Sequence, residues 1–290
     1  MELRALEHFV AVVDEGGFTR AAERLMVAQP GVSAQIRNLE RELGQALFER
    51  HARGATLTAA GVAALPHARA ALAAAAAVSQ DVAALTGLLR GTLRIGVLLS
   101  SAGMQMPALL REFRDAAPAV ELRVVEDDAA NLLAGVRQGT LDVAWTATAD
   151  RELDDLAGVT VSLEPLAALV GPGHRWARRR TVTLTELCGE PLLSVPAGGG
   201  LRTVLEEACA AEGLTPRITL EANSPVLLAA LAAQGLGVAL VPASFAAGAA
   251  AALRIVRPAL IGRVQVVWRR ENPSPATRAF TRLVLRGTSG

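Results

Sequence analysis

FTRAAERLMVAQPGVSAQIRNLERELGQALFER is the sequence of residues 18–50, and it decides the fold of the N-terminal region because it predicts two helices at helix-turn-helix spacing. The first helix covers residues 18–25, with Thr19 as its candidate N-cap. The second follows a tight connection, has Pro30 in its first turn and ends at Gly44. Its apolar residues recur at steps of four, three and four, typical of one buried stripe: Val32, Ile36, Leu39 and Leu43.

The opposite face of the second predicted helix is mostly polar. Gln, Ser, Asn and Arg side chains hydrogen-bond base edges or phosphates when a helix enters the major groove of DNA. Every amphipathic helix has a polar face, however, so an ordinary helix pair remains an alternative at this point. The residues on this face are Gln29, Ser33, Ala34, Arg37, Asn38 and Arg41.

The flanking segments favour DNA binding. Residues 3–13 predict a preceding amphipathic helix, closed by Gly16 and Gly17. Residues 47–50, a turn at 51–54 and residues 55–57 predict a β-hairpin. Three helices and a hairpin make a winged helix-turn-helix domain over residues 1–58. Arg50 and Arg53 would lie on its wing, within reach of phosphates.

The order FTRAAERL…AQPGVSAQIRNLERELGQALFER…LTAAG closely resembles the DNA-binding head of LysR-type transcriptional regulators. The resemblance covers essentially the whole chain. Looser matches follow in the same order: LRIG at 93–96, Pro107–Leu110 with Phe113, GTLDVA at 139–144, GLGVALVP at 235–242 and VVWRR at 266–270. Ala34 departs from the family, since many members have a basic residue there. The candidate DNA-contacting residues are Thr19, Arg20, Gln29, Pro30, Ser33, Ala34, Arg37, Asn38, Arg50 and Arg53.

Composition sets limits on these expectations. The chain has 290 residues, and 51% of them are hydrophobic. This composition allows a large buried core, and the length predicts more than one domain. Its net charge is +1, and residues 1–58 contain seven Arg against eight Asp or Glu. That balance argues against strong non-specific DNA binding but not against a sequence-specific contact face.

Cys188 and Cys209 are interpreted as reduced core residues of a cytoplasmic protein, with a redox-sensing pair as the alternative. No signal peptide is evident.

Residues 225–253 carry no charge and are long enough to span a bilayer. Gln234, Gly235, Gly237, Pro242 and Gly248 interrupt this stretch. It is therefore interpreted as a helix over 225–234, a strand over 236–241 and a short helix after Pro242. A membrane span is the disfavoured alternative.

Residues 59–89 are rich in alanine, which predicts one long helix, although a flexible low-complexity linker is the alternative. Pro66 should kink this helix near its start. The resemblance implies that the segment is a dimerisation helix. Its thin apolar seam consists of Leu65, Leu72, Val82, Leu85 and Leu89.

From residue 90 onward, strand-like runs alternate with helical patterns, which indicates parallel sheets with crossover helices. The strands are expected at 93–98, 120–126, 141–147, 164–171, 191–195, 217–222, 237–241, 253–256 and 263–270. The helices are expected at 102–116, 129–138, 201–212, 225–234 and 275–286. Two α/β lobes with a returning C-terminus make the type II periplasmic-binding-protein fold, and the resemblance implies the same fold. Lobe I is expected at 90–161 and 267–290, and lobe II at 162–266.

Two predicted strands run into helices through loops that could bind an anion, at residues 99–101 and 196–200. Helix N-termini at the carboxyl ends of strands offer backbone N–H groups and a favourable dipole. Arg202 would add a bidentate partner for a carboxylate, and apolar side chains would cover the rest of the ligand. The resemblance places a small-molecule effector between the lobes. The candidate effector-binding residues are Ser100, Ser101, Met104, Glu126, Trp145, Thr146, Ser194, Arg202, Asn223 and Val241.

Enzyme interpretations have weak support. The four His residues lack metal-ligand spacing, and no P-loop is present. A nucleotide-dependent enzyme with a phosphate-binding loop at 198–200 and a solute-binding protein remain as alternatives.

The sequence therefore predicts a cytoplasmic transcriptional regulator without a cofactor, metal site or membrane contact. The resemblance implies dyad-symmetric operator DNA and further copies of the chain, as dimer and tetramer, as its partners. RNA polymerase is a further candidate partner.

Overall fold

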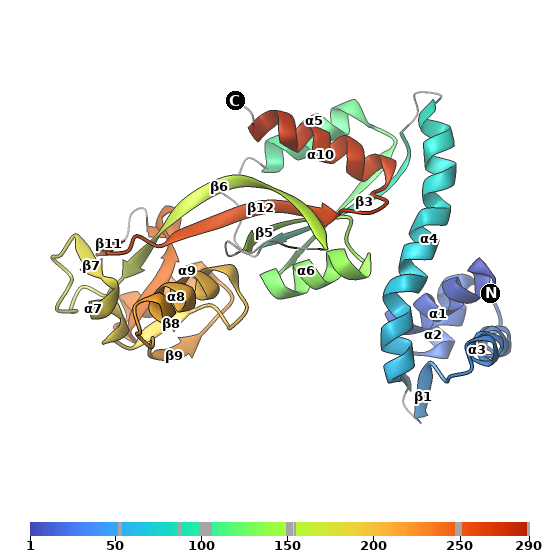
Figure 1. Cartoon of the computed structure of the whole chain (residues 1–290), viewed down its shortest axis with the longest axis horizontal. Helices are drawn as coiled ribbons and strands as arrows, with labels where there is room; N and C mark the ends of the chain where they lie inside the picture. The colour runs from blue at the N-terminus through green and yellow to red at the C-terminus, as the bar shows by residue number, and fades with distance from the viewer. Residues whose placement is uncertain are drawn as a thin grey trace. The chain divides into compact units, whose positions relative to one another are not determined.

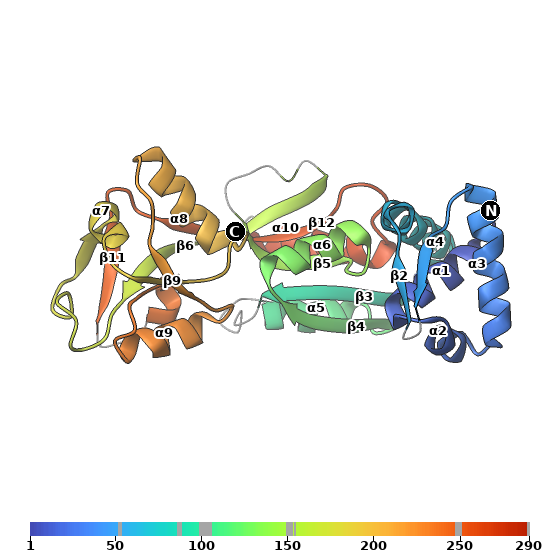
Figure 2. The same ribbon diagram turned by 90° about the horizontal axis from the view of Figure 1, so that it is seen from below.

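The computed structural model describes residues 1–51, 54–85, 89–98, 106–148, 153, 155–246 and 251–288. It divides into two compact units, Met1–Gly91 and most of the chain from Thr92 onward. Figures 1 and 2 show the elements of each unit, coloured along the chain.

The first unit begins with the predicted winged helix-turn-helix head. Gly16 and Gly44 end α1 and α3 in the left-handed conformation, with φ of 65° and 70°, as C-terminal glycines commonly do. The expectation that Thr19 caps the helix over residues 18–25 is wrong, because α2 already begins at Phe18 and its N-cap is Gly17. The head consists of α1 (Leu3–Glu15), α2 (Phe18–Leu25), α3 (Gln29–Leu43), β1 (Phe48–His51) and β2 (Gly54–Leu57), with the two strands paired antiparallel.

The core of the head also holds the start of the next helix. α4 (Ala59–Leu85) is one helix with Pro66 inside it, which supports a helical linker over a flexible one. Leu65 and Ala68 are buried in the head core, and Leu72 packs against it. The expectation that Leu65 belongs to the apolar seam is therefore wrong, because the head core buries it, whereas Leu72 is only half-buried. Farther along α4, Val78 and Val82 are exposed.

The second unit is a long mixed sheet with helices on both faces. The strand order is β4-β3-β5-β12-β6-β10-β8-β9, and β11 and β7 extend it from β6. The strand pairs β3–β5, β8–β9 and β8–β10 are parallel, as the alternating pattern predicts. β6 (Leu156–Leu169) and β12 (Ile261–Arg269) are long antiparallel neighbours that connect the two halves of the unit (Figure 1).

Lobe I lies at one end of these two strands. α5 and α10 pack together on one face of its sheet, where the rings of Phe113 and Phe280 meet edge to face at 5.4 Å (Figure 1). Leu132 and Val136 of α6 form a cluster with Ala144 and Val267. The elements of this lobe are β3 (Gly91–Leu98), α5 (Met106–Ala116), β4 (Val120–Asp127), α6 (Ala129–Gln138), β5 (Val143–Thr148) and α10 (Pro275–Thr288).

Lobe II lies at the other end of the long strands. Successive strand residues point to opposite faces, so Leu192 packs beneath α8 while Leu193 packs beneath α9. β7 and α7 were not predicted, because both are very short. The elements are β7 (Thr181–Thr183), α7 (Leu184–Cys188), β8 (Leu192–Ser194), α8 (Gly200–Ala211), β9 (Ile218–Glu221), α9 (Pro225–Ala233), β10 (Val238–Pro242), η1 (Ala243–Ala246) and β11 (Ala252–Val256).

The uncharged stretch from residue 225 is divided among α9, β10 and η1, so a membrane span there is wrong. Among the described residues, one helical segment is long and apolar enough to cross a membrane by length and composition alone. It is Ala59–Val78 of α4, with a mean hydropathy of 1.4. Part of this segment belongs to the head core.

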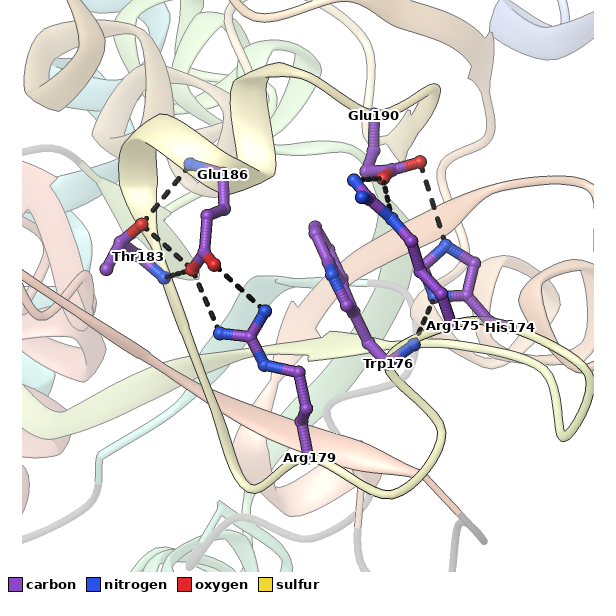
Figure 3. Close-up of polar contacts among 7 residues, drawn as sticks. All are labelled: His174, Arg175, Trp176, Arg179, Thr183, Glu186 and Glu190. Carbon is purple, nitrogen blue, oxygen red and sulfur yellow. Dashed lines mark hydrogen bonds and ion pairs between the residues drawn. The ribbon is translucent and has the colours of Figure 1, made fainter.

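Trp176 organises the polar end of lobe II (Figure 3). The guanidinium groups of Arg175 and Arg179 lie 5.3 and 5.7 Å from its ring centroid. Arg179 also binds Glu186 through two hydrogen bonds of 2.9 and 3.1 Å. These bonds, followed by those from the backbone and hydroxyl of Thr183, lower the pKa of Glu186 to about 2.

Candidate functional site

The polar face of α3 is the candidate DNA-binding surface. Gln29, Arg37 and Asn38 are exposed, while Val32, Ile36 and Leu39 on the other face are buried. Ser33 differs from the prediction because its side chain is only 5% exposed and accepts a 2.8 Å hydrogen bond from Gln29 Nε2. The placement of Ser33 on the open face is therefore wrong. Its hydroxyl instead holds the Gln29 amide.

The remaining candidates on the head have mixed environments. Thr19 and Arg20 of α2 and Pro30 of α3 are exposed, and Ala34 is half-buried. The Asn38 amide oxygen accepts a hydrogen bond from Arg41. Arg50 lies on β1, but its side chain is outside the described part of the structure, as is the whole of Arg53.

A cavity of about 150 Å³ lies between the two lobes of the second unit. Asp127, Asp128 and Ala147 line it from lobe I, and residues 195–197 and 199–201 line it from lobe II. A cavity of this volume accepts a molecule about the size of one aromatic ring. The site therefore suits a small ligand.

The first turn of α8 forms one wall of this cavity. Its N-cap is Gly199, so no side chain caps the helix, and the early backbone N–H groups of a helix lack intrahelical partners. Gly200 lies so close to the end of β5 that an added Cβ would be 2.7 Å from the carbonyl carbon and oxygen of Ala147. Glycine at this position thus allows α8 to contact lobe I directly.

The charged lining of the cavity was not predicted. Asp127, Asp128, Glu164 and Arg263 all line it. Asp128 accepts a hydrogen bond from the backbone N–H of Asn131 in α6, and Glu164 accepts one of 2.8 Å from Ser244. These carboxylates come from β4, the start of α6 and β6. Sequence spacing gives no indication that they meet, because the tertiary fold brings them together.

Arg202 does not line the cavity, so the expectation that it faces the ligand is wrong. Its Nε donates a 2.7 Å hydrogen bond to Glu206, and its Nη1 donates one of 2.9 Å to Glu221. The Arg202 guanidinium is therefore already hydrogen-bonded to two protein carboxylates.

The other candidate effector residues also differ from expectation. Asn223 lines the cavity, whereas Glu126 is exposed and its neighbour Asp127 lines the site instead. Four candidates are buried and outside the lining: Trp145, Thr146, Ser194 and Val241. Trp145 Nε1, Thr146 Oγ1 and Ser194 Oγ have no hydrogen-bond partner within the described residues. Ser100, Ser101 and Met104 lie outside that part of the chain.

The comparisons with known proteins identify both units. Residues 3–62 match the bacterial regulatory helix-turn-helix family of LysR type, and residues 86–289 match the LysR substrate binding domain. The chain belongs to the LysR family. It is a DNA-binding transcriptional regulator with a substrate-binding domain, as the sequence resemblance implied.

Relatives of this LysR-family regulator cover most of its length. The regulator ShiR of Corynebacterium glutamicum is 37% identical over 83% of this chain and 82% of its own length. The dual regulator GltC of Bacillus subtilis is 32% identical over 84% and 81%. These relatives are transcriptional regulators and not enzymes, which confirms that part of the prediction.

Solved structures give the same assignment. Full-length OxyR from Pseudomonas aeruginosa matches with a TM-score of 0.76 and 26% identity, covering 99% of this chain and 94% of the other. Full-length CbnR complexed with its target DNA matches with a TM-score of 0.65 and 29% identity, covering 99% and 100%. Within the described residues of this regulator, no group of His, Cys, Asp and Glu side chains could hold a metal ion.

Proposed function

We propose that the regulator reads its operator with the exposed face of α3. The observation that carries this proposal is that Gln29, Arg37 and Asn38 are exposed on the helix whose other face is buried in the head core. Gln29 is held by Ser33 before any base is present, which lowers the conformational entropy lost when its amide pairs with a base. Arg37 and Asn38 then contact a base edge or a phosphate, and Thr19, Arg20 and Pro30 contact the DNA backbone at the start of the two helices. Arg50 and Arg53 on the wing bind phosphates.

Operator selectivity tests this proposal. Gln29→Ala should reduce the preference for operator over unrelated DNA by about 1–3 kcal/mol, the worth of one good base contact. Ser33→Ala should have a smaller effect in the same direction, because it frees the Gln29 amide without removing it. Gln45→Ala, an exposed substitution just beyond α3, is the control and should leave selectivity unchanged. Unchanged selectivity in Gln29→Ala would exclude Gln29 from base readout.

We further propose that the chain acts in the cytoplasm as a dimer, and as a tetramer of two dimers, on operators with dyad symmetry. Only 17% of the apolar segment Ala59–Val78 is buried within one chain, and Val78 and Val82 continue the apolar surface beyond the head. A second copy of α4 is the proposed cover of this surface, since small alanine side chains allow close approach of two helices. RNA polymerase is a further proposed partner.

The effector is proposed to be a small organic acid that also carries hydrogen-bond donors. The uncapped first turn of α8 and the guanidinium of Arg263 favour an anionic group. Asp127, Asp128 and Glu164 on the same cavity favour amino or hydroxyl groups elsewhere on the ligand. A hydroxy acid or an amino acid combines both features, whereas a simple hydrocarbon acid offers these carboxylates no hydrogen-bond donor. Ligand binding in the cavity would then change the orientation of lobe I relative to lobe II, whose helix α8 lines the cavity.

A further inference from the structure

Two cysteines from different helices meet in lobe II. Cys188 is the last residue of α7, and Cys209 lies near the end of α8. Their Sγ atoms are 3.3 Å apart, although 21 positions separate the two residues in the sequence. Cys209 is 1% exposed and belongs to the lobe core, whereas Cys188 is only partly buried at the edge of that core. The structure therefore presents one partly buried cysteine and one buried cysteine in direct contact.

The chemistry of the two thiols differs in the same way. Burial, and then the hydrogen bond with Cys188, raises the pKa of Cys209 to about 12. Cys209 therefore keeps its proton at neutral pH, and either sulfur can donate the hydrogen bond between the two. The more accessible Cys188 is therefore the cysteine that an oxidant meets first.

We propose that Cys188 and Cys209 form a dithiol switch that a hydroperoxide closes to an intrachain disulfide. The sulfur of Cys188 attacks one peroxide oxygen, which cleaves the O–O bond and gives a sulfenic acid and an alcohol or water. The sulfur of Cys209 then attacks the Cys188 sulfur, which forms the S–S bond and releases the sulfenic oxygen as water. Two thiols and one hydroperoxide thus give a disulfide, an alcohol and water, with both thiols oxidised and the peroxide reduced.

The geometry permits this closure within the folded lobe. A disulfide has an S–S distance of about 2.05 Å, so the two sulfurs need to approach by little more than 1 Å. The bond would join α7 to α8, whose first turn lines the cavity between the lobes. Oxidation would thereby fix one wall of the proposed effector site. The disulfide itself depends on neither DNA binding nor effector binding, so it can be tested separately from both.

The full-length protein gives a direct test because Cys188 and Cys209 are its only cysteines. The reduced protein is treated with hydrogen peroxide at low protein concentration, and its free thiols and intact mass are then measured. The proposal predicts that two free thiols fall to none, that the mass drops by about 2 Da as two hydrogens are lost, and that dithiothreitol reverses both changes. A peptide joining residues 188 and 209 should appear only under non-reducing conditions.

Single-cysteine variants separate this switch from ordinary oxidation. In C209S, Cys188 should gain oxygen and remain uncrosslinked, whereas in C188S the buried Cys209 should keep its thiol under the same treatment. The oxidised wild type should also melt about 5–10 °C above the reduced form, because the crosslink restricts the unfolded chain. Two thiols that persist under excess peroxide, a mass increase in place of the loss, or disulfides only between chains would overturn the proposal.

Discussion

Arg69 of α4 donates a hydrogen bond to Asp14 at the end of α1, with 2.5 Å between Nη2 and Oδ1. The other carboxylate oxygen of Asp14 accepts a 3.3 Å hydrogen bond from Arg24 of α2. One carboxylate therefore joins the first two helices of the head to the linker helix. Since Leu65 and Ala68 also lie in the head core, the first half of α4 belongs to the head as a rigid part of it. Any change in the direction of α4 is then carried directly to the DNA-binding helices.

Asp14→Asn should loosen this connection. The change removes the charge that compensates Arg69, and we expect the head and α4 to lose about 0.5–1 kcal/mol of stability, as is usual for a solvent-exposed ion pair. All three Trp residues lie in the second unit, so hydrogen exchange of peptides from α1 and α4 is the measurement. Glu7→Gln, at an exposed acid of the same helix, is the control. If exchange in α4 is equal in the two variants, the Asp14–Arg69 pair does not hold the linker.

Val78→Asp combined with Val82→Asp should shift the protein toward monomers, because charges would then enter the proposed α4 pair. Ala76→Asp is the matched control, since a helix turns about 100° per residue and Ala76 therefore lies far from both valines. Light scattering during size exclusion measures the mass of each variant. A double variant that keeps the wild-type mass would rule out this part of α4 as the dimer contact.

The effector proposal predicts that only one of two arginines affects ligand binding. Hydroxy acids and amino acids that bind should stabilise the protein by about 2.7 kcal/mol at a concentration one hundred times Kd. Arg263→Ala should weaken this effect, while Arg202→Ala should leave ligand affinity unchanged because Glu206 and Glu221 hold that side chain. Arg254→Ala, at an exposed site outside the cavity, controls for loss of one positive charge. Thermal shift across acids, their amides and neutral sugars is the assay. Equal stabilisation by acids and by their amides would contradict an anionic effector.

Gly200→Ala should force α8 away from β5. The new Cβ would be 2.7 Å from backbone atoms of Ala147, which cannot move as a flexible side chain could. We expect a loss of about 1–3 kcal/mol in stability, typical of overpacking, and altered ligand affinity. Gly173→Ala is the control, because nothing lies within 4 Å of a Cβ at that position. Identical unfolding midpoints in urea for the two variants would show that lobe I moves to accommodate the new Cβ without a loss in the free energy of unfolding.

The Glu186 contacts predict a pH dependence in lobe II. The pKa of Glu186 is lowered from 4.5 to about 2, so its stabilising contribution is fully present above about pH 4.5. It is lost as the pH falls through about 2, where the folded protein also binds the proton. Glu186→Gln should therefore lower stability at pH 7, with the difference from wild type shrinking toward pH 2. Trp176 packs against Arg179, so tryptophan fluorescence in urea reports on this region, and exposed Glu207→Gln is the control. A difference that stays constant from pH 7 to pH 2 would contradict the lowered pKa.

Local sequence determined much of the fold. The bounds of α2 and the ends of α1 and α3 follow from helical periodicity and from Gly16 and Gly44, whose backbone conformations favour glycine. The alternation of strands and helices after residue 90 predicted both lobes, because short-range periodicity records which face of an element is buried. The long strand β6 was underestimated because only residues near its end form a continuous apolar run.

The functional details were decided by the tertiary structure. The sequence puts Ser33 on a polar face, but packing of the head buries its hydroxyl against Gln29. The sequence alone allowed Arg202 of α8 to face a ligand. The fold instead brings Glu221 of β9 to its guanidinium. The meeting of Asp127, Glu164 and Arg263 around one cavity depends on contacts between residues far apart in the chain. Periodicity and capping act over a few residues and fix the elements themselves, while burial and charge pairing at a site depend on which elements meet, and only the folded chain sets that.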